Sequence, residues 1–95
     1  MTINHSTRIH LASGQSSSAL GKETIVLNYE QGNYYELNEI GGFIWALLQT
    51  NKVMSVEEIQ EKILDEFDVE EDVCQKELKL FLENMLLERL IETTA

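Results

Sequence analysis

Segment 32–45 constrains the fold of this chain most, because it leads from a short aromatic strand directly into an apolar helix. Before it, residues 23–29 are rich in β-branched and aromatic side chains and predict a strand. Glycine adopts positive φ readily, so Gly32 predicts the end of a tight turn, and residues 33–37 predict the returning strand. A β part and an α part are therefore joined within one short stretch of chain.

The helix predicted over residues 39–50 begins with Asn38, whose side-chain oxygen can accept a free amide of the first turn. Its apolar residues recur at the spacing of a buried stripe: Ile40, Phe43, Ile44, Leu47 and Leu48. Gly41 and Gly42 weaken such a helix by about 1 kcal/mol each relative to alanine. We therefore expect them to allow a close approach of helix to sheet, and we expect Trp45 to close the core.

The remaining elements complete a simple order. Residues 8–12 alternate polar and apolar side chains and predict a short strand, and the small polar residues 13–19 predict a flexible loop. A capping box at 55–58, preceded by a polar turn over residues 51–54, starts a helix that reaches about Phe67. The last helix is predicted over roughly residues 71–91. The element order predicts one α+β domain over residues 1–95, winged-helix-like, with a three-stranded antiparallel sheet followed by three helices.

Composition and sequence length are consistent with one small domain that does not span a membrane. The chain has 95 residues and 43% hydrophobic content, which suits one modest core. No stretch approaches the ~20 consecutive apolar residues of a membrane span, and the first residues lack the pattern of a signal peptide. A lone cysteine, Cys74, forms no internal disulfide. We therefore expect a cytoplasmic protein without a membrane partner.

The formal net charge of −10 is concentrated in the second half, where residues 55–95 carry thirteen acids against four bases. Such a surface repels phosphate backbones, so a nucleic-acid partner is not expected. The acidity has two interpretations that the sequence leaves open. It provides solubility, or it attracts a basic partner or peptide.

Catalytic and metal-binding patterns are not found in the sequence. His5 and His10 lie in the polar N-terminal region, and no spacing with Cys74 resembles a zinc site. Gly41-Gly42 lacks the surroundings of a phosphate-binding loop. We therefore expect no enzyme, no metal and no cofactor.

The last predicted helix has more apolar faces than a small domain needs. One face makes a sufficient core stripe: Cys74, Leu78, Phe81, Leu82, Met85 and Leu90. On a neighbouring face Val73, Leu80 and Leu87 recur every seven residues, with Glu77 and Asn84 between them. Three explanations remain open: this face is buried by the domain's own sheet, receives a ligand segment, or forms a helical dimer contact.

The strand over residues 33–37 ends the predicted meander, so one of its edges is expected to be unpaired. The period of two places Tyr35 and Leu37 on one face of the strand and Tyr34 and Glu36 on the other. An open edge presents amides and carbonyls that another extended chain can pair with. If the second face of the last helix flanks this edge, the two together form a backbone ladder beside an apolar wall, which is the arrangement of β-augmentation.

Six short motifs follow one another over residues 8–91: GNYYELN (32–38), GFIWALL (42–48), SVEEI (55–59), FDV (67–69), FLENM (81–85) and LI (90–91). In order and spacing they resemble the PqqD-like family, the peptide chaperones or precursor-recognition elements of ribosomally made and modified peptides. Within it, the chain is most similar to the stand-alone leader-binding proteins of lasso-peptide biosynthesis. Arg89 stands where many relatives have a glycine, which favours continuation of the last helix.

The resemblance implies that a precursor's leader peptide is clamped as an added strand between the third strand and the third helix. By position, it assigns peptide binding to the residues of that strand and that helix face: Asn33, Tyr34, Tyr35, Glu36, Leu37, Val73, Glu77, Leu80, Asn84 and Leu87. It further implies two partner enzymes, a leader peptidase and a cyclase that closes a macrolactam ring.

The hypothesis from the sequence is thus a non-catalytic leader-binding protein, acting as a monomer or weak homodimer. One alternative is a small structural or homodimerisation module that uses the last helix. Another is the recognition protein of a different modified-peptide pathway. A winged-helix transcription factor is disfavoured by the charge of residues 55–95, because that class needs a basic recognition helix.

Overall fold

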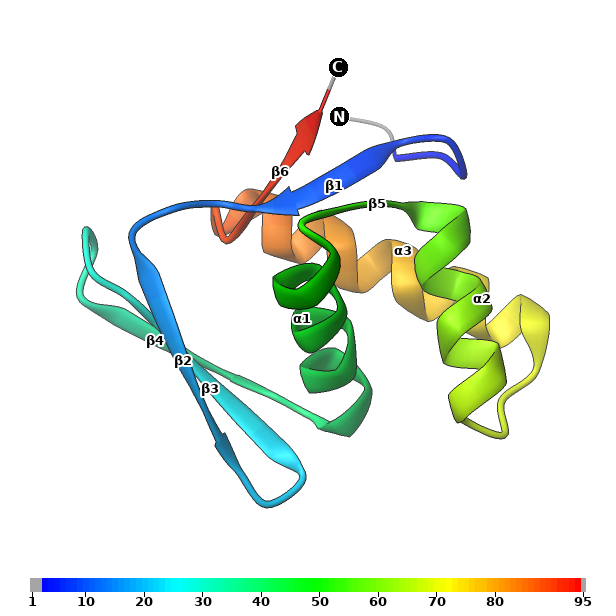
Figure 1. The fold of residues 1–95 in the computed structure, drawn as a ribbon, viewed down its shortest axis with the longest axis horizontal. Helices are drawn as coiled ribbons and strands as arrows, with labels where there is room; N and C mark the ends of the chain where they lie inside the picture. Colours follow the sequence, from blue (N-terminus) through cyan, green and yellow to red (C-terminus); the bar gives the residue numbers. More distant parts are fainter. Residues whose placement is uncertain (1–2, 95) are drawn as a thin grey trace.

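Two three-stranded antiparallel sheets and three helices build the fold in the computed structural model, which describes residues 3–94 (Figure 1). The elements in chain order are β1 (Arg8–Leu11), β2 (Gln15–Leu20), β3 (Glu23–Asn28), β4 (Asn33–Leu37), α1 (Glu39–Asn51), β5 (Val53–Ser55), α2 (Val56–Glu66), α3 (Glu71–Leu87) and β6 (Ile91–Thr94). One sheet has the order β2-β3-β4 and the other has the order β5-β1-β6. The predicted α+β class, with an antiparallel sheet followed by helices, is confirmed.

The loop predicted over residues 13–19 is wrong for most of its length, because β2 occupies it. The whole strand pairs with β3, from Gln15 opposite Asn28 to Leu20 opposite Glu23. Serine-rich sequence has low strand propensity, so this strand owes its existence to its partner rather than to its own residues. Gly21, with φ of +63°, makes the turn between the two strands.

Strand β1 does not join the meander as predicted but lies in the middle of the second sheet. Arg8 is opposite Ser55 of β5 on one side and opposite Thr94 of β6 on the other. Residues 53–55 were expected in a turn, and residues 91–94 at or beyond the end of the last helix. Alternation along residues 8–12 indicates a strand but carries no information about such distant partners.

Helix α3 ends at Leu87, so the prediction that it continues to residue 91 is wrong. Arg89 adopts the left-handed conformation, with φ of +61°. Its amide donates to the carbonyl of Leu86 at 3.1 Å, and the amide of Leu90 donates to Met85 at 2.9 Å. These two bonds form a Schellman motif, in which the left-handed position usually holds glycine. Arginine therefore serves here in place of glycine, and the chain turns back into β6.

The predicted start of α1 is confirmed, as Asn38 accepts a hydrogen bond from the amide of Gly41 at 2.8 Å. The two glycines lie close to neighbouring elements. A Cβ on Gly42 would lie 2.5 Å from Oγ1 of Thr24 in β3, and one on Gly41 would lie 3.1 Å from the ring of Phe81. Gly42 thus lets α1 approach the sheet, as expected, and Gly41 lets it approach α3. The capping box of Ser55 is also confirmed.

The core lies between the two sheets and the three helices. Its fully buried side chains come from both halves of the chain: Ile9, Val26, Ile44, Ile59, Leu82, Leu90 and Ile91. Trp45 is buried as predicted, and its indole N–H donates to Oγ of Ser17 in β2 at 3.0 Å. None of the helices described within residues 3–94 combines the length and apolarity that crossing a membrane requires.

Candidate functional site

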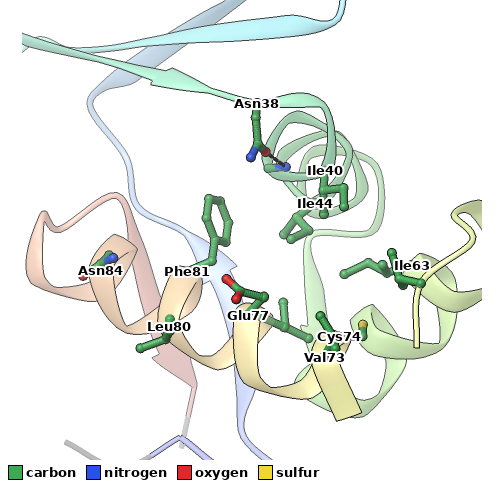
Figure 2. Close-up of a pocket in the computed structure, with 13 residues that line it drawn as sticks. Asn38, Ile40, Ile44, Ile63, Val73, Cys74, Glu77, Leu80, Phe81 and Asn84 are labelled. Carbon is green, nitrogen blue, oxygen red and sulfur yellow. Dashed lines mark hydrogen bonds between the residues drawn. The ribbon is translucent and has the colours of Figure 1, made fainter. Parts of the chain in front are cut away.

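A pocket of about 440 Å³ lies between α3 and the beginning of α1 (Figure 2). Its lining is mostly apolar: Ile40, Gly41, Ile44, Ile63, Val69, Val73, Cys74, Leu78, Leu80 and Phe81, with Asn38, Glu77 and Asn84 as the polar members. We call this pocket the α3 groove. It is large enough for several side chains of a bound segment, and its apolar lining favours binding of apolar ones.

Four residues predicted from the second apolar face of the last helix lie together in the α3 groove, namely Val73, Glu77, Leu80 and Asn84. Val73 is 48% exposed and Leu80 is 50% exposed, so the explanation that the domain's own sheet buries this face is wrong. Leu87, the fifth predicted residue, is 79% exposed and does not line the pocket. A ligand segment and a dimer contact remain as explanations of this face.

The strand half of the predicted site is an open edge. Strand β4 pairs with β3 and, within residues 3–94, with no other strand. As predicted, Leu37 is buried and Tyr35 is half-buried, whereas Tyr34 and Glu36 are exposed. In an antiparallel pair, every second residue turns its N–H and C=O away from the partner, so β4 offers a row of such groups at its free edge.

The residues of β4 do not themselves line the α3 groove, which begins one residue later, at Asn38. The open edge and the pocket are therefore consecutive along the chain rather than superimposed. Figure 2 shows Asn38 at the point where β4 passes into α1, with the ring of Phe81 across from it on α3.

Two contacts show how this part of the chain is aligned with α3. The phenol of Tyr35 donates to Oε2 of Glu88, just beyond the end of α3, at 2.9 Å. Further along the chain, Gly41 faces the ring of Phe81, which lies earlier in α3. The segment from β4 to α1 and the helix α3 therefore run in opposite directions, and a chain that follows the free edge of β4 would lead toward the α3 groove.

Several residues of the α3 groove were assigned by sequence only to the core, namely Ile40, Ile44, Cys74, Leu78 and Phe81. Ile44, Cys74 and Leu78 are buried and form its floor, whereas Ile40 and Phe81 are half-buried. Burial raises the pKa of the Cys74 thiol. Phe81 follows Leu80 directly and lies one helical turn after Glu77. This spacing was a signal in the sequence that Phe81 borders the face of Val73, Glu77 and Leu80.

Among residues 3–94, one charged residue, Glu77, lines the α3 groove, and no Lys, Arg or His does. A second cavity of about 400 Å³ involves another side of α3 and contains Lys76 and Lys79 together with His5 and Asp72. Within residues 3–94, no group of three or more His, Cys, Asp or Glu side chains is arranged to hold a metal ion.

The fold and the site define a small α+β domain with an open strand edge that leads into an apolar helix-lined pocket. Residues 23–91 match the sequence profile of the family described as coenzyme PQQ synthesis protein D (PqqD). Since this match covers more than half of the chain, the protein belongs to the PqqD family, as its motifs predicted. No curated protein matches the chain.

Two solved structures have the same fold. One is described as TbiB1 in complex with the TbiA(beta) leader peptide; its TM-score is 0.80 at 27% identity, over 90% of this chain and 98% of that one. The other is described as lasso peptide synthetase B1 complexed with the leader peptide; its TM-score is 0.74 at 15% identity, over 88% of this chain and 96% of that one. The second similarity shows the fold alone.

Proposed function

We propose that this protein binds the leader segment of a ribosomally synthesised precursor peptide and does not itself catalyse a reaction. The observation that carries this proposal is the continuity of the open β4 edge with the α3 groove. Membership of the PqqD family and the likeness to TbiB1, whose structure contains a leader peptide, support it.

Binding would proceed by strand addition to β4. Hydrogen bonds to the free edge fix the register of the leader, because a shift by one residue would turn every leader side chain to the other face. Apolar leader side chains that point toward α3 would enter the α3 groove beside Val73 and Leu80, and this supplies selectivity. Asn84 lines the same groove, and Leu87 extends the same helix face beyond it.

The biological purpose we propose is delivery of the precursor to a leader peptidase and to a macrolactam-forming cyclase in lasso-peptide biosynthesis. A protein that holds the leader raises the local concentration of the precursor at its processing enzymes, so a modest affinity suffices. Because precursor synthesis occurs on ribosomes, we place this function in the cytoplasm.

The direct test is titration of the protein with synthetic leader peptides from precursors encoded beside it, followed by fluorescence polarisation. We expect saturable binding that Leu80→Asp weakens by roughly tenfold or more, because a carboxylate would replace an apolar contact in the α3 groove. Leu20→Asp is the matched control, since Leu20 is 62% exposed but lies in β2, outside the groove. Absence of binding to every such leader would refute the proposal.

Strand addition is tested separately from pocket filling. A leader N-methylated at a position that pairs with β4 loses a backbone hydrogen bond while its side chains are unchanged. We expect methylation to weaken binding at alternate leader positions only. Equal tolerance at all positions would show that the leader is not bound as a strand.

The second candidate function is a homodimerisation module, which the exposed apolar face of α3 favours. Sedimentation velocity at increasing protein concentration distinguishes the two. A tight dimer that Leu80→Asp dissociates would favour this candidate, whereas a monomer or weak dimer leaves the groove open to a leader.

A further inference from the structure

We infer that the peptide segment held in the α3 groove carries a lysine or arginine side chain that pairs with Glu77, between apolar side chains that fill the rest of the pocket. This inference rests on the proposed function, because it describes the ligand of the same site. It specifies the chemistry of that ligand from the charges of this chain.

Glu77 lines the α3 groove, and its side chain is exposed to solvent in the free protein. Figure 2 shows its carboxylate on the side of α3 that faces α1. Its neighbours on the same helix face are Val73 and Leu80, one turn before and one turn after it. A segment bound in the groove would therefore meet one carboxylate surrounded by apolar surface.

No basic side chain of the described part of the chain, residues 3–94, pairs with this carboxylate. Within residues 3–94, no lysine or arginine lies within ion-pairing distance of Glu77, and the one close contact between a basic and an acidic side chain joins His10 to Glu92 in the β1–β6 pair. The two lysines of α3, Lys76 and Lys79, line the other cavity. Glu39 lies between the lining residues Asn38 and Ile40 in sequence and adds a second negative charge at the start of α1.

A bound segment would remove water from Glu77, and the cost of that step depends on the segment. An uncharged apolar segment would leave the carboxylate desolvated without a partner, which is unfavourable. An acidic segment would add repulsion, whereas a lysine or arginine would form a charge-assisted hydrogen bond. Glu77 therefore selects for a cation by penalising the alternatives, and the overall charge of −10 attracts a basic segment before contact.

The test is an mRNA-display selection of random peptides, long enough to span β4 and the groove, against the full chain and against its Glu77→Lys variant. Peptides selected by the unmodified protein should carry Lys or Arg at one fixed position between apolar residues. Peptides selected by Glu77→Lys should carry Asp or Glu at that position. Replacing the selected lysine by glutamine should weaken binding to the unmodified protein by about tenfold and leave binding to Glu77→Gln unchanged.

Two controls separate this inference from the proposed function. Glu61→Gln removes an exposed carboxylate of α2 that lines neither cavity, and it should select the same peptides as the unmodified protein. One outcome would overturn the inference and leave the proposed function standing. In it, the selected peptides lose binding to Leu80→Asp, but they have no charge preference that Glu77→Lys reverses. If no selected peptide depends on Leu80, both are overturned.

Discussion

The phenol of Tyr35 donates a hydrogen bond of 2.9 Å to the carboxylate of Glu88, and this contact joins the edge strand β4 to the C-terminal end of α3. The two residues come from the two halves of the proposed binding site, the open edge and the helix. Their contact fixes the spacing of strand and helix at one end, while the α3 groove lies toward the other.

The hydrogen bond to Glu88, with a smaller contribution from burial, raises the pKa of Tyr35 above its usual value. The neutral phenol is thus favoured in the folded state. Its contribution to stability is fully present below the unfolded-state pKa and is lost as the pH rises through the higher folded-state pKa. We expect Glu88→Gln to lower the pKa of Tyr35, measured as the tyrosinate absorbance that Tyr35→Phe removes from an alkaline titration. An unchanged Tyr35 titration in Glu88→Gln would contradict the contact.

Replacement of Arg89 by glycine should stabilise the protein. A side chain in the left-handed conformation is strained, and glycine avoids this strain at some entropic cost in the unfolded chain, so we expect a gain of about 0.5–1 kcal/mol. Urea unfolding followed by circular dichroism measures it. Arg89→Ala is the control, because it removes the same side chain but keeps a Cβ at φ of +61°. Equal stability of the two variants would mean that the backbone strain is negligible.

Replacement of Gly42 by alanine should destabilise the protein, although alanine is the better helix former. The new Cβ would lie 2.5 Å from Oγ1 and 3.3 Å from Cβ of Thr24, which is too close unless the Thr24 side chain, α1 or β3 shifts. We expect a net loss of roughly 1 kcal/mol, as overpacking outweighs helix propensity. In a double-mutant cycle, Thr24→Ala should restore part of this loss. Additive effects of the two changes would place the strain elsewhere.

The thiol of Cys74 should react slowly with a disulfide reagent in the native protein. Cys74 is buried, and burial raises its pKa, so little of the reactive thiolate is present at neutral pH. Since Cys74 also lines the α3 groove, a bound leader should slow the reaction further. The urea-unfolded chain provides the reference rate. A native rate equal to this reference would show that the groove is open to reagent down to its floor.

Sequence predicted most reliably the features whose determinants lie within a few residues of one another. Asn38 and Ser55 were identified as helix caps, because a cap and the amides it accepts are neighbours in the chain. Residues 23–29 and 33–37 were identified as a hairpin for the same reason. In each case the signal and the structure it specifies occupy the same short segment.

Features that depend on distant partners were missed. Strand β2 pairs along β3, and Ser17 accepts the hydrogen bond of Trp45 from α1, but nothing in a serine-rich run indicates either contact. The sharp end of α3 was missed because Arg89 is a poor candidate for a left-handed position. Arg89 does not itself favour the left-handed conformation. The pairing of β6 with β1, which requires the chain to turn back after α3, determines it.

The candidate site was predicted in part. Val73, Glu77, Leu80 and Asn84 could be grouped because they share one face of a helix, and they do lie together in the α3 groove. Sequence could not show that Ile44 and Cys74 form its floor, because a buried apolar residue has the same pattern in a closed core as beneath a pocket. Which buried side chains border an opening is decided by the packing of α1 against α3.

The central position of β1 in the sheet β5-β1-β6 has a consequence for how this protein is made. Arg8 leaves the ribosome long before its partner Thr94, because the whole of the β2-β3-β4 sheet and all three helices lie between them in the chain. The sheet β5-β1-β6 therefore cannot close until β6 has been synthesised, and Ile9 and Ile91 are not buried together before that point. A nascent chain that has already formed the β2-β3-β4 sheet and its helices still has an incomplete core, so the last step of folding depends on the emergence of β6.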